Sequence, residues 1–154
     1  MIAFAASLGG CPTSTSSDSC VDYTAPASFN AQSPTVSLAK DVVPIFTQSC
    51  AFSSCHGSTG GGNNGIFLGG TDPAKIHDAI VNVASSELPS MVYVKAGDAR
   101  ESYLMRKLDG SQCALNAQCT GSDCGDPMPR NDTALPVDTR DTIRRWIAQG
   151  ANNN

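Results

Sequence analysis

The sequence has 154 residues, of which 40% are hydrophobic and 16% are charged, and this length fits one compact domain plus some unstructured chain. A net charge of −4 argues against a nucleic-acid-binding surface, because such surfaces neutralise phosphates with Lys and Arg. Seven cysteines and only 6% aromatic residues indicate an oxidising compartment, where covalent links supplement a modest core.

The N-terminal residues 1–10 form an apolar run that ends at Cys11 and is shorter than the roughly 20 residues that a transmembrane helix needs. The run Leu8-Gly9-Gly10-Cys11 resembles the lipobox of bacterial lipoproteins, without the usual basic region before it. We expect residues 1–10 to be the remnant of a signal peptide and Cys11 to carry a lipid anchor. An apolar terminus with a free cysteine is the alternative.

Residues 11–36 are rich in Ser, Thr, Pro and Ala and poor in large apolar side chains. Such a segment buries too little to offset the entropy lost on ordering. We expect it to be a flexible tether, and we expect the domain to occupy residues 37–152.

Four helices are predicted within that domain, and no segment shows convincing strand alternation, so the fold class is all-α. The first leads into Cys50, and Pro44 leaves open whether it starts near Asp41 or starts earlier and is kinked. The others are expected over residues 73–83 after an Asp72 N-cap, over 102–108 after a capping box at 98–101, and from the opening Asp138-x-x-Asp141 to the terminator Gly150.

The segment Cys50-Ala-Phe-Ser-Ser-Cys55-His56-Gly57 carries the most specific chemical signal. In c-type haem attachment two thiols bind the haem vinyl groups, and the His after the second Cys becomes an axial iron ligand. The usual motif has two residues between the cysteines, and this segment has four. A disulfide or half of a zinc site is the alternative, and the other candidate zinc ligands, Cys113, Cys119 and Cys124, have irregular spacing.

The second axial ligand is expected at Met128, because c-type haem commonly takes a Met thioether opposite the His. Met128 lies between two prolines in a turn-rich loop, which is an unusual place for a core methionine. Met105 has apolar helical neighbours that favour a core role, Met91 has no supporting pattern, and His77 beside an Asp favours a surface position.

Four cysteines then remain for two disulfides: Cys20, Cys113, Cys119 and Cys124. Three connectivities are possible and the sequence does not select one. A bridge within residues 113–124 would brace the loop that presents Met128.

Residues 39–151 resemble the single-haem cytochrome c domains of secreted proteins and lipoproteins of environmental bacteria. The resemblance rests on five blocks in a matching order: 41–46, Cys55-His56-Gly57, 97–108, Met128-Pro129, and 143–151. It implies a cytochrome c-like fold with long loops and disulfides, in which the first and last helices cross beside the haem near Phe46 and Trp146. The four-residue spacing between the attachment cysteines is also known in some multihaem cytochromes.

These features together predict an electron carrier with one covalently attached haem c, bound through Cys50 and Cys55 and ligated by His56 and Met128. We expect redox proteins as partners, no nucleic acid, no enzymatic activity, and a location in the periplasm or at the cell surface. Arg106, Lys107 and Arg130 are candidate partners of the haem propionates. Two alternatives remain: a small haem peroxidase or gas-binding domain, and a haem-free module stabilised by disulfides or zinc.

Overall fold

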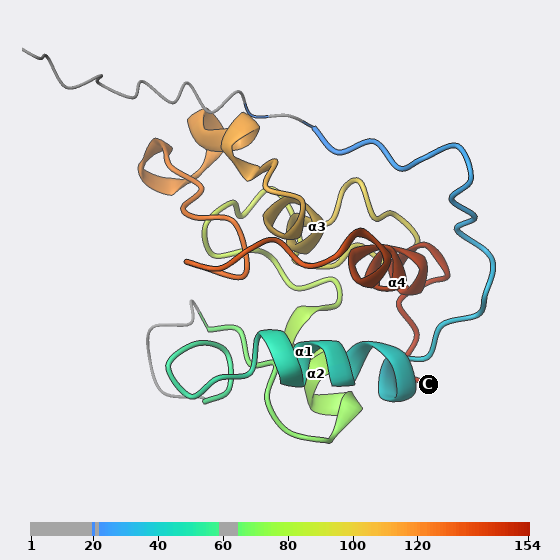
Figure 1. Cartoon of the computed structure of the whole chain (residues 1–154). Coiled ribbons are helices and arrows are strands. Elements are labelled where there is room, and N and C mark those ends of the chain that lie inside the picture. The colour runs from blue at the N-terminus through green and yellow to red at the C-terminus, as the bar shows by residue number, and fades with distance from the viewer. Residues whose placement is uncertain (1–19, 21, 59–64) are drawn as a thin grey trace, which may run out of the picture.

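The computed structural model describes residue 20, residues 22–58 and residues 65–154, and within them the chain forms four α-helices and no named strand (Figure 1). The α-helices are α1 (Val43–Ser49), α2 (Pro73–Ile80), α3 (Tyr103–Leu108) and α4 (Val137–Ala148). A π-helical turn, η1 (Leu38–Val42), precedes α1, and two 3₁₀ segments, η2 (Gln112–Gln118) and η3 (Thr120–Ser122), follow α3. The expected all-α class and long loops are confirmed for this part of the chain.

The first helical segment starts at Leu38 and changes its hydrogen-bonding pattern before Pro44. Ser37 caps η1 by accepting a hydrogen bond from the Lys40 amide. Pro44 then lies in the first turn of α1, directly after the change from π-helical to α-helical hydrogen bonding. The earlier of the two expected starts is therefore the observed one, with the break at the proline.

The core lies between this first segment and the last helix. η1 contacts α4, and α4 also contacts α3, so these elements surround one apolar interior. Phe46, Trp146 and Ile143 are almost completely buried there. The C-terminal Asn154 closes the arrangement, because its backbone carbonyl accepts the Ala39 amide at 2.9 Å (Figure 1).

Helix α2 starts as expected and ends earlier than expected. The Asp72 side chain accepts the Ala74 amide at 3.0 Å, and Pro73 occupies the first turn. The helix ends at Ile80 rather than near residue 83, because Val81 is extended and the following Asn82 has a φ of 57°.

The starts of α3 and α4 differ from the expected capping pattern. Asp98 accepts the Glu101 amide in a turn, and α3 begins after Ser102 with no side-chain cap. The last helix, α4, starts at Val137, one residue before the expected opening at Asp138, and no side chain caps it. Asp141 is buried in an ion pair with Arg144 at 3.1 Å. An ion pair within α4 therefore occupies that carboxylate in place of a capping role.

A buried ionic cluster joins the end of α3 to α4. Asp109, with 5% of its side chain exposed, pairs with Arg140 at 2.6 Å and with Arg144 at 2.9 Å. The Arg144 guanidinium also lies over the ring of Tyr23, 4.3 Å from its centroid, and Tyr23 donates to Asp141 at 3.3 Å. Paired charges of this kind tolerate burial that a single charge would not.

The described part of the segment expected as a tether makes further contacts with α4 and the following turn. The Arg145 guanidinium donates to the Asn30 carbonyl at 3.0 Å and lies over the ring of Phe29. Gln149 donates to the carbonyls of Ala31 and Pro34. These contacts, together with the Cys20–Cys113 disulfide, attach this part of the chain to the domain.

Among the described residues, no helix is long and apolar enough to cross a membrane. The expected signal-peptide remnant and the expected lipid site at Cys11 lie outside the described residues.

Candidate functional site

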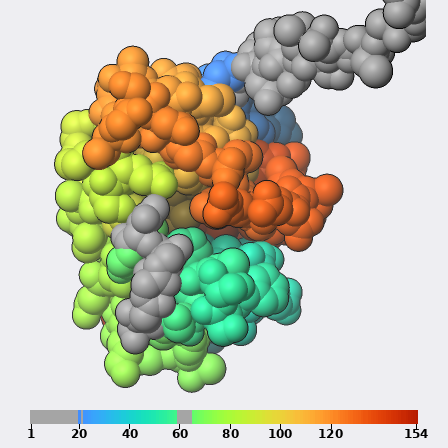
Figure 2. Space-filling view, turned by 90° about the vertical axis from the view of Figure 1, so that its left-hand side faces the viewer, coloured from blue at the N-terminus to red at the C-terminus, as the bar shows by residue number. Residues whose placement is uncertain are grey.

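A cavity of about 550 Å³ opens between the end of α1 and the loop that follows η3. Figure 2 shows this hollow face, with residues around 50 on one side and residues around 130 on the other. A smaller hollow of about 60 Å³ shares several lining residues with it and extends toward Tyr93 and Tyr103. The lining includes all four residues that the sequence predicts as a site: Cys50, Cys55, His56 and Met128. Its volume is typical of cofactor and ligand sites in proteins.

The end of α1 places the two thiols and the imidazole together. Cys50 is the C-cap of α1, and its carbonyl accepts the His56 amide at 3.1 Å, so the intervening residues form a compact turn. Gly57 completes that turn, because a Cβ at this position would collide with the carbonyl of Ala51. The Cys-His-Gly order therefore has a local steric reason as well as a chemical one.

Cys50 and Cys55 are both free thiols. Burial, followed by the neighbouring Cys55, raises the pKa of Cys50 to about 11, so this thiol stays protonated at neutral pH. Cys55 is exposed at the cavity mouth beside Phe52, whose side chain is 55% exposed. The two thiols thus have different environments on the same wall.

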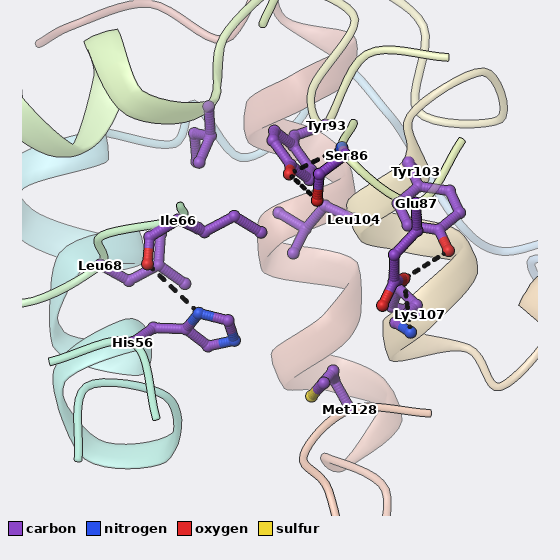
Figure 3. Close-up of a pocket in the computed structure, with 11 residues that line it drawn as sticks. His56, Ile66, Leu68, Ser86, Glu87, Tyr93, Tyr103, Leu104, Lys107 and Met128 are labelled. Atoms are coloured by element: carbon purple, nitrogen blue, oxygen red, sulfur yellow. Dashed lines mark hydrogen bonds and ion pairs between the residues drawn. The ribbon is translucent and has the colours of Figure 1, made fainter. Parts of the chain in front are cut away.

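His56 has one ring nitrogen fixed and the other directed into the cavity. Its Nδ1 lies 3.3 Å from the Ile66 carbonyl oxygen, and because a carbonyl only accepts, Nδ1 carries the proton. Nε2 then has a free lone pair, and Figure 3 shows it on the side of the ring that faces the space beside Met128. Burial lowers the pKa of His56; the hydrogen bond to the Ile66 carbonyl opposes this shift, and the nearby Lys107 charge adds to it. A neutral imidazole with a fixed tautomer is the form that binds metals.

Met128 lines the cavity from a different part of the chain than His56. It belongs to the loop after η3, and its amide donates to the Lys107 carbonyl at 2.9 Å. In Figure 3 its sulfur lies on the side of the residue that faces the His56 half of the pocket. An imidazole nitrogen and a thioether sulfur therefore reach one space from two walls.

A buried polar cluster that the sequence did not predict lies in the opposite wall of the smaller hollow (Figure 3). The Lys107 ammonium donates to Glu87 at 3.0 Å and to the Cys124 carbonyl at 2.6 Å. The Tyr103 hydroxyl donates to Glu87 at 2.7 Å, and burial together with this carboxylate raises the pKa of Tyr103. The only sequence signal was the four-residue spacing that puts Tyr103 and Lys107 on one face of α3.

The weaker ligand candidates do not line the cavity. His77 lies on α2 and pairs with Asp78 at 3.3 Å. Met105 is 2% exposed in the core, as its helical neighbours predicted, and Met91 packs partly buried against the same core. Arg106 pairs with Asp22 at 2.6 Å, outside the cavity lining.

The two expected disulfides are present and use all four of the expected cysteines. They join Cys20 to Cys113 and Cys119 to Cys124. The three cysteines considered as zinc ligands, Cys113, Cys119 and Cys124, are thus all in disulfides. In the part of the chain that the structure describes, no group of three or more His, Cys, Asp or Glu side chains could hold a metal ion.

Comparison with known proteins gives no further assignment. A scan against protein-family models, a search of curated proteins and a search of solved structures each found no match. The argument for function therefore rests on the residues of the cavity.

Proposed function

We propose that this chain is a mono-haem c-type cytochrome that carries single electrons in the cell envelope. The observation that carries the proposal is that two unpaired thiols, one imidazole and one thioether line the same cavity. These are the residue types that would hold a haem c, with the two cysteines as attachment sites and the imidazole and thioether as iron ligands. The other described cysteines are in disulfides, so the free pair is set apart from them.

The cavity residues fit the group. Each thiol can add its S–H across one vinyl group, which forms a thioether and needs no oxidant. The His56 Nε2 lone pair is available because Nδ1 bonds the Ile66 carbonyl, and this bond also fixes the plane of the ring. Leu68 and Leu104 line this space with apolar side chains, which would limit the contact of a bound group with water.

Bound haem would supply the one-electron couple of its iron, and the protein would supply the ligands, the dry crevice and access for a partner. Cys55 and Phe52 are exposed at the cavity mouth, and this exposure is consistent with access of a partner protein to a bound haem. No acid–base or nucleophilic step is required, so we propose no enzymatic activity. The partners would be redox proteins, and the two disulfides favour the periplasm or the cell surface.

The test is export of the full chain in cells competent in cytochrome c maturation, followed by pyridine haemochrome analysis, intact mass and a visible spectrum. We expect one covalent haem and the weak far-red ferric band of Met ligation. Met128→Ala should remove that band and keep the covalent haem, whereas the matched variant Met105→Leu, in the core, should keep both.

A colourless product of polypeptide mass, from cells that mature a control cytochrome, would refute the proposal and leave a haem-free disulfide module. A covalent haem whose ferric spectrum does not change in Met128→Ala would instead support an open sixth position, as in a small peroxidase or gas-binding domain.

A further inference from the structure

The loop of residues 124–128, which ends at Met128, is held at both ends by one residue. At its start the Cys124 carbonyl accepts the Lys107 ammonium at 2.6 Å. At its end the Met128 amide donates to the Lys107 backbone carbonyl at 2.9 Å. The side chain and the backbone of Lys107 therefore fix the two ends of a five-residue segment.

Lys107 is itself fixed within the fold. It lies in the last turn of α3 and is 7% exposed, and its ammonium also pairs with Glu87 at 3.0 Å. Tyr103 donates toward the same carboxylate and lies 3.2 Å from the Cys124 carbonyl. A buried ammonium with these partners has little freedom to move, since leaving any of them would expose an unpaired charge to an apolar interior.

The loop fits closely around the ammonium. Gly125 has a φ of 66°, and a Cβ there would lie 3.4 Å from the Lys107 Nζ and 3.3 Å from a Glu87 oxygen. The Gly125 carbonyl accepts Gln112 at 3.1 Å, which adds a third attachment between the two ends. The loop geometry is thus built around the Lys107 side chain.

We infer that Lys107 is a positioning residue for Met128, and that its ammonium holds the loop so that the thioether faces the cavity. Removal of a residue that holds a metal ligand in place commonly lowers the metal affinity strongly. The ligand role of Met128 rests on the proposed function, whereas the ordering of the loop by Lys107 does not. Lys107 is therefore assigned to the loop rather than to a haem propionate.

The experiment compares Lys107→Met with Glu87→Gln. Lys107→Met keeps the apolar stem and removes the ammonium, whereas Glu87→Gln removes the ion pair and keeps the bond from the ammonium to the Cys124 carbonyl. In the haem-loaded protein we expect Lys107→Met to lose most of the far-red Met band with covalent haem unchanged, and Glu87→Gln to keep the band.

A second readout needs no haem. In the haem-free full chain we expect the Met128 amide to exchange with deuterium roughly tenfold faster in Lys107→Met than in the original chain, because a charge-assisted hydrogen bond contributes on the order of 1.5 kcal/mol. Glu87→Gln should leave that rate near its original value. NMR resolves this single amide.

An unchanged band and unchanged exchange in Lys107→Met would overturn the inference, and so would equal changes in both variants, because a purely structural cluster predicts equal changes. If the original chain proves colourless, the proposed function fails and the amide exchange still decides whether Lys107 orders the loop. If Lys107→Met does not fold, the double variant Lys107→Met/Glu87→Gln replaces it, because it also removes the carboxylate left unpaired. The exchange rate of the Met128 amide in this double variant then tests whether Lys107 orders the loop.

Discussion

Two segments of this chain hold a pair of cysteines separated by four residues, and they have opposite outcomes in the structure. Cys119 and Cys124 form a disulfide with their Cα atoms 5.3 Å apart. Cys50 and Cys55 remain free thiols and line the cavity. Equal spacing therefore does not decide whether a pair of cysteines closes.

The conformation of the intervening residues accounts for the difference. Between Cys119 and Cys124, Gly121 and Ser122 both have positive φ, at 74° and 59°, which turns the chain back on itself. Between Cys50 and Cys55 no residue has positive φ, and the chain continues from α1 into a turn closed by the His56 amide. The first geometry closes a bridge, and the second presents two thiols to a cavity.

The largest effect should come from removing the free pair. We expect Cys50→Ser/Cys55→Ser to abolish covalent haem completely, because no other free thiols lie in the described cavity lining. Pyridine haemochrome and intact mass measure the loss, with Cys119→Ser/Cys124→Ser as the control of equal spacing. Covalent haem in the first variant would contradict the assignment of the attachment residues.

The second largest effect should come from opening the disulfide between Cys20 and Cys113, which should lower stability without changing haem content. Cys20→Ser/Cys113→Ser opens a link across a sequence separation of 93 and should lower the free energy of unfolding by about 4 kcal/mol. Because this bridge does not touch the cavity, the haem content should not change. Urea denaturation of the exported protein measures the loss, and a change below about 1 kcal/mol would show that the contacts of residues 22–36 suffice without the bridge.

The short disulfide should have a smaller effect. Cys119→Ser/Cys124→Ser opens a link across a sequence separation of 5, and the entropic loss is about 2 kcal/mol. The far-red Met band should persist, because the Lys107 ammonium still holds the Cys124 backbone carbonyl. Loss of the band in this variant would mean that the bridge, rather than Lys107, positions Met128.

The smallest expected effect is a difference in reactivity between the two free thiols, Cys50 and Cys55, in the unaltered protein. In the haem-free protein at pH 8, Cys50 should react with iodoacetamide far more slowly than Cys55, because with a pKa of about 11 roughly one Cys50 in a thousand is a thiolate. The Cys50 rate should rise as the pH approaches 11. Peptide mass mapping over time gives both rates, and equal rates in the folded protein that match those in urea would contradict the burial of Cys50.

The same pKa shift affects stability in the alkaline range. The folded-state pKa of Cys50 lies above that of the unfolded chain, so the stability gained by keeping this thiol neutral is complete below about pH 8.5. It is lost as the pH rises toward 11.

Local sequence determined much of this protein. The helical class, the Asp72 cap, the burial of Met105 and the presence of two disulfides followed from periodicity, turn chemistry and cysteine counting. These features depend on residues close in sequence or on composition, which a single chain displays directly. The grouping of Cys50, Cys55 and His56 also follows from their proximity along the chain.

Only the tertiary structure decided which distant residues meet. It paired Cys20 with Cys113, joined Asp109 to Arg140 and Arg144, and brought Met128 to the cavity of His56. It also attached residues 22–36 to α4 although their composition favoured a free segment. Contacts of this kind depend on how the helices pack. A local sequence pattern does not specify which distant residue pairs with a buried charge or which part of the chain a loop contacts.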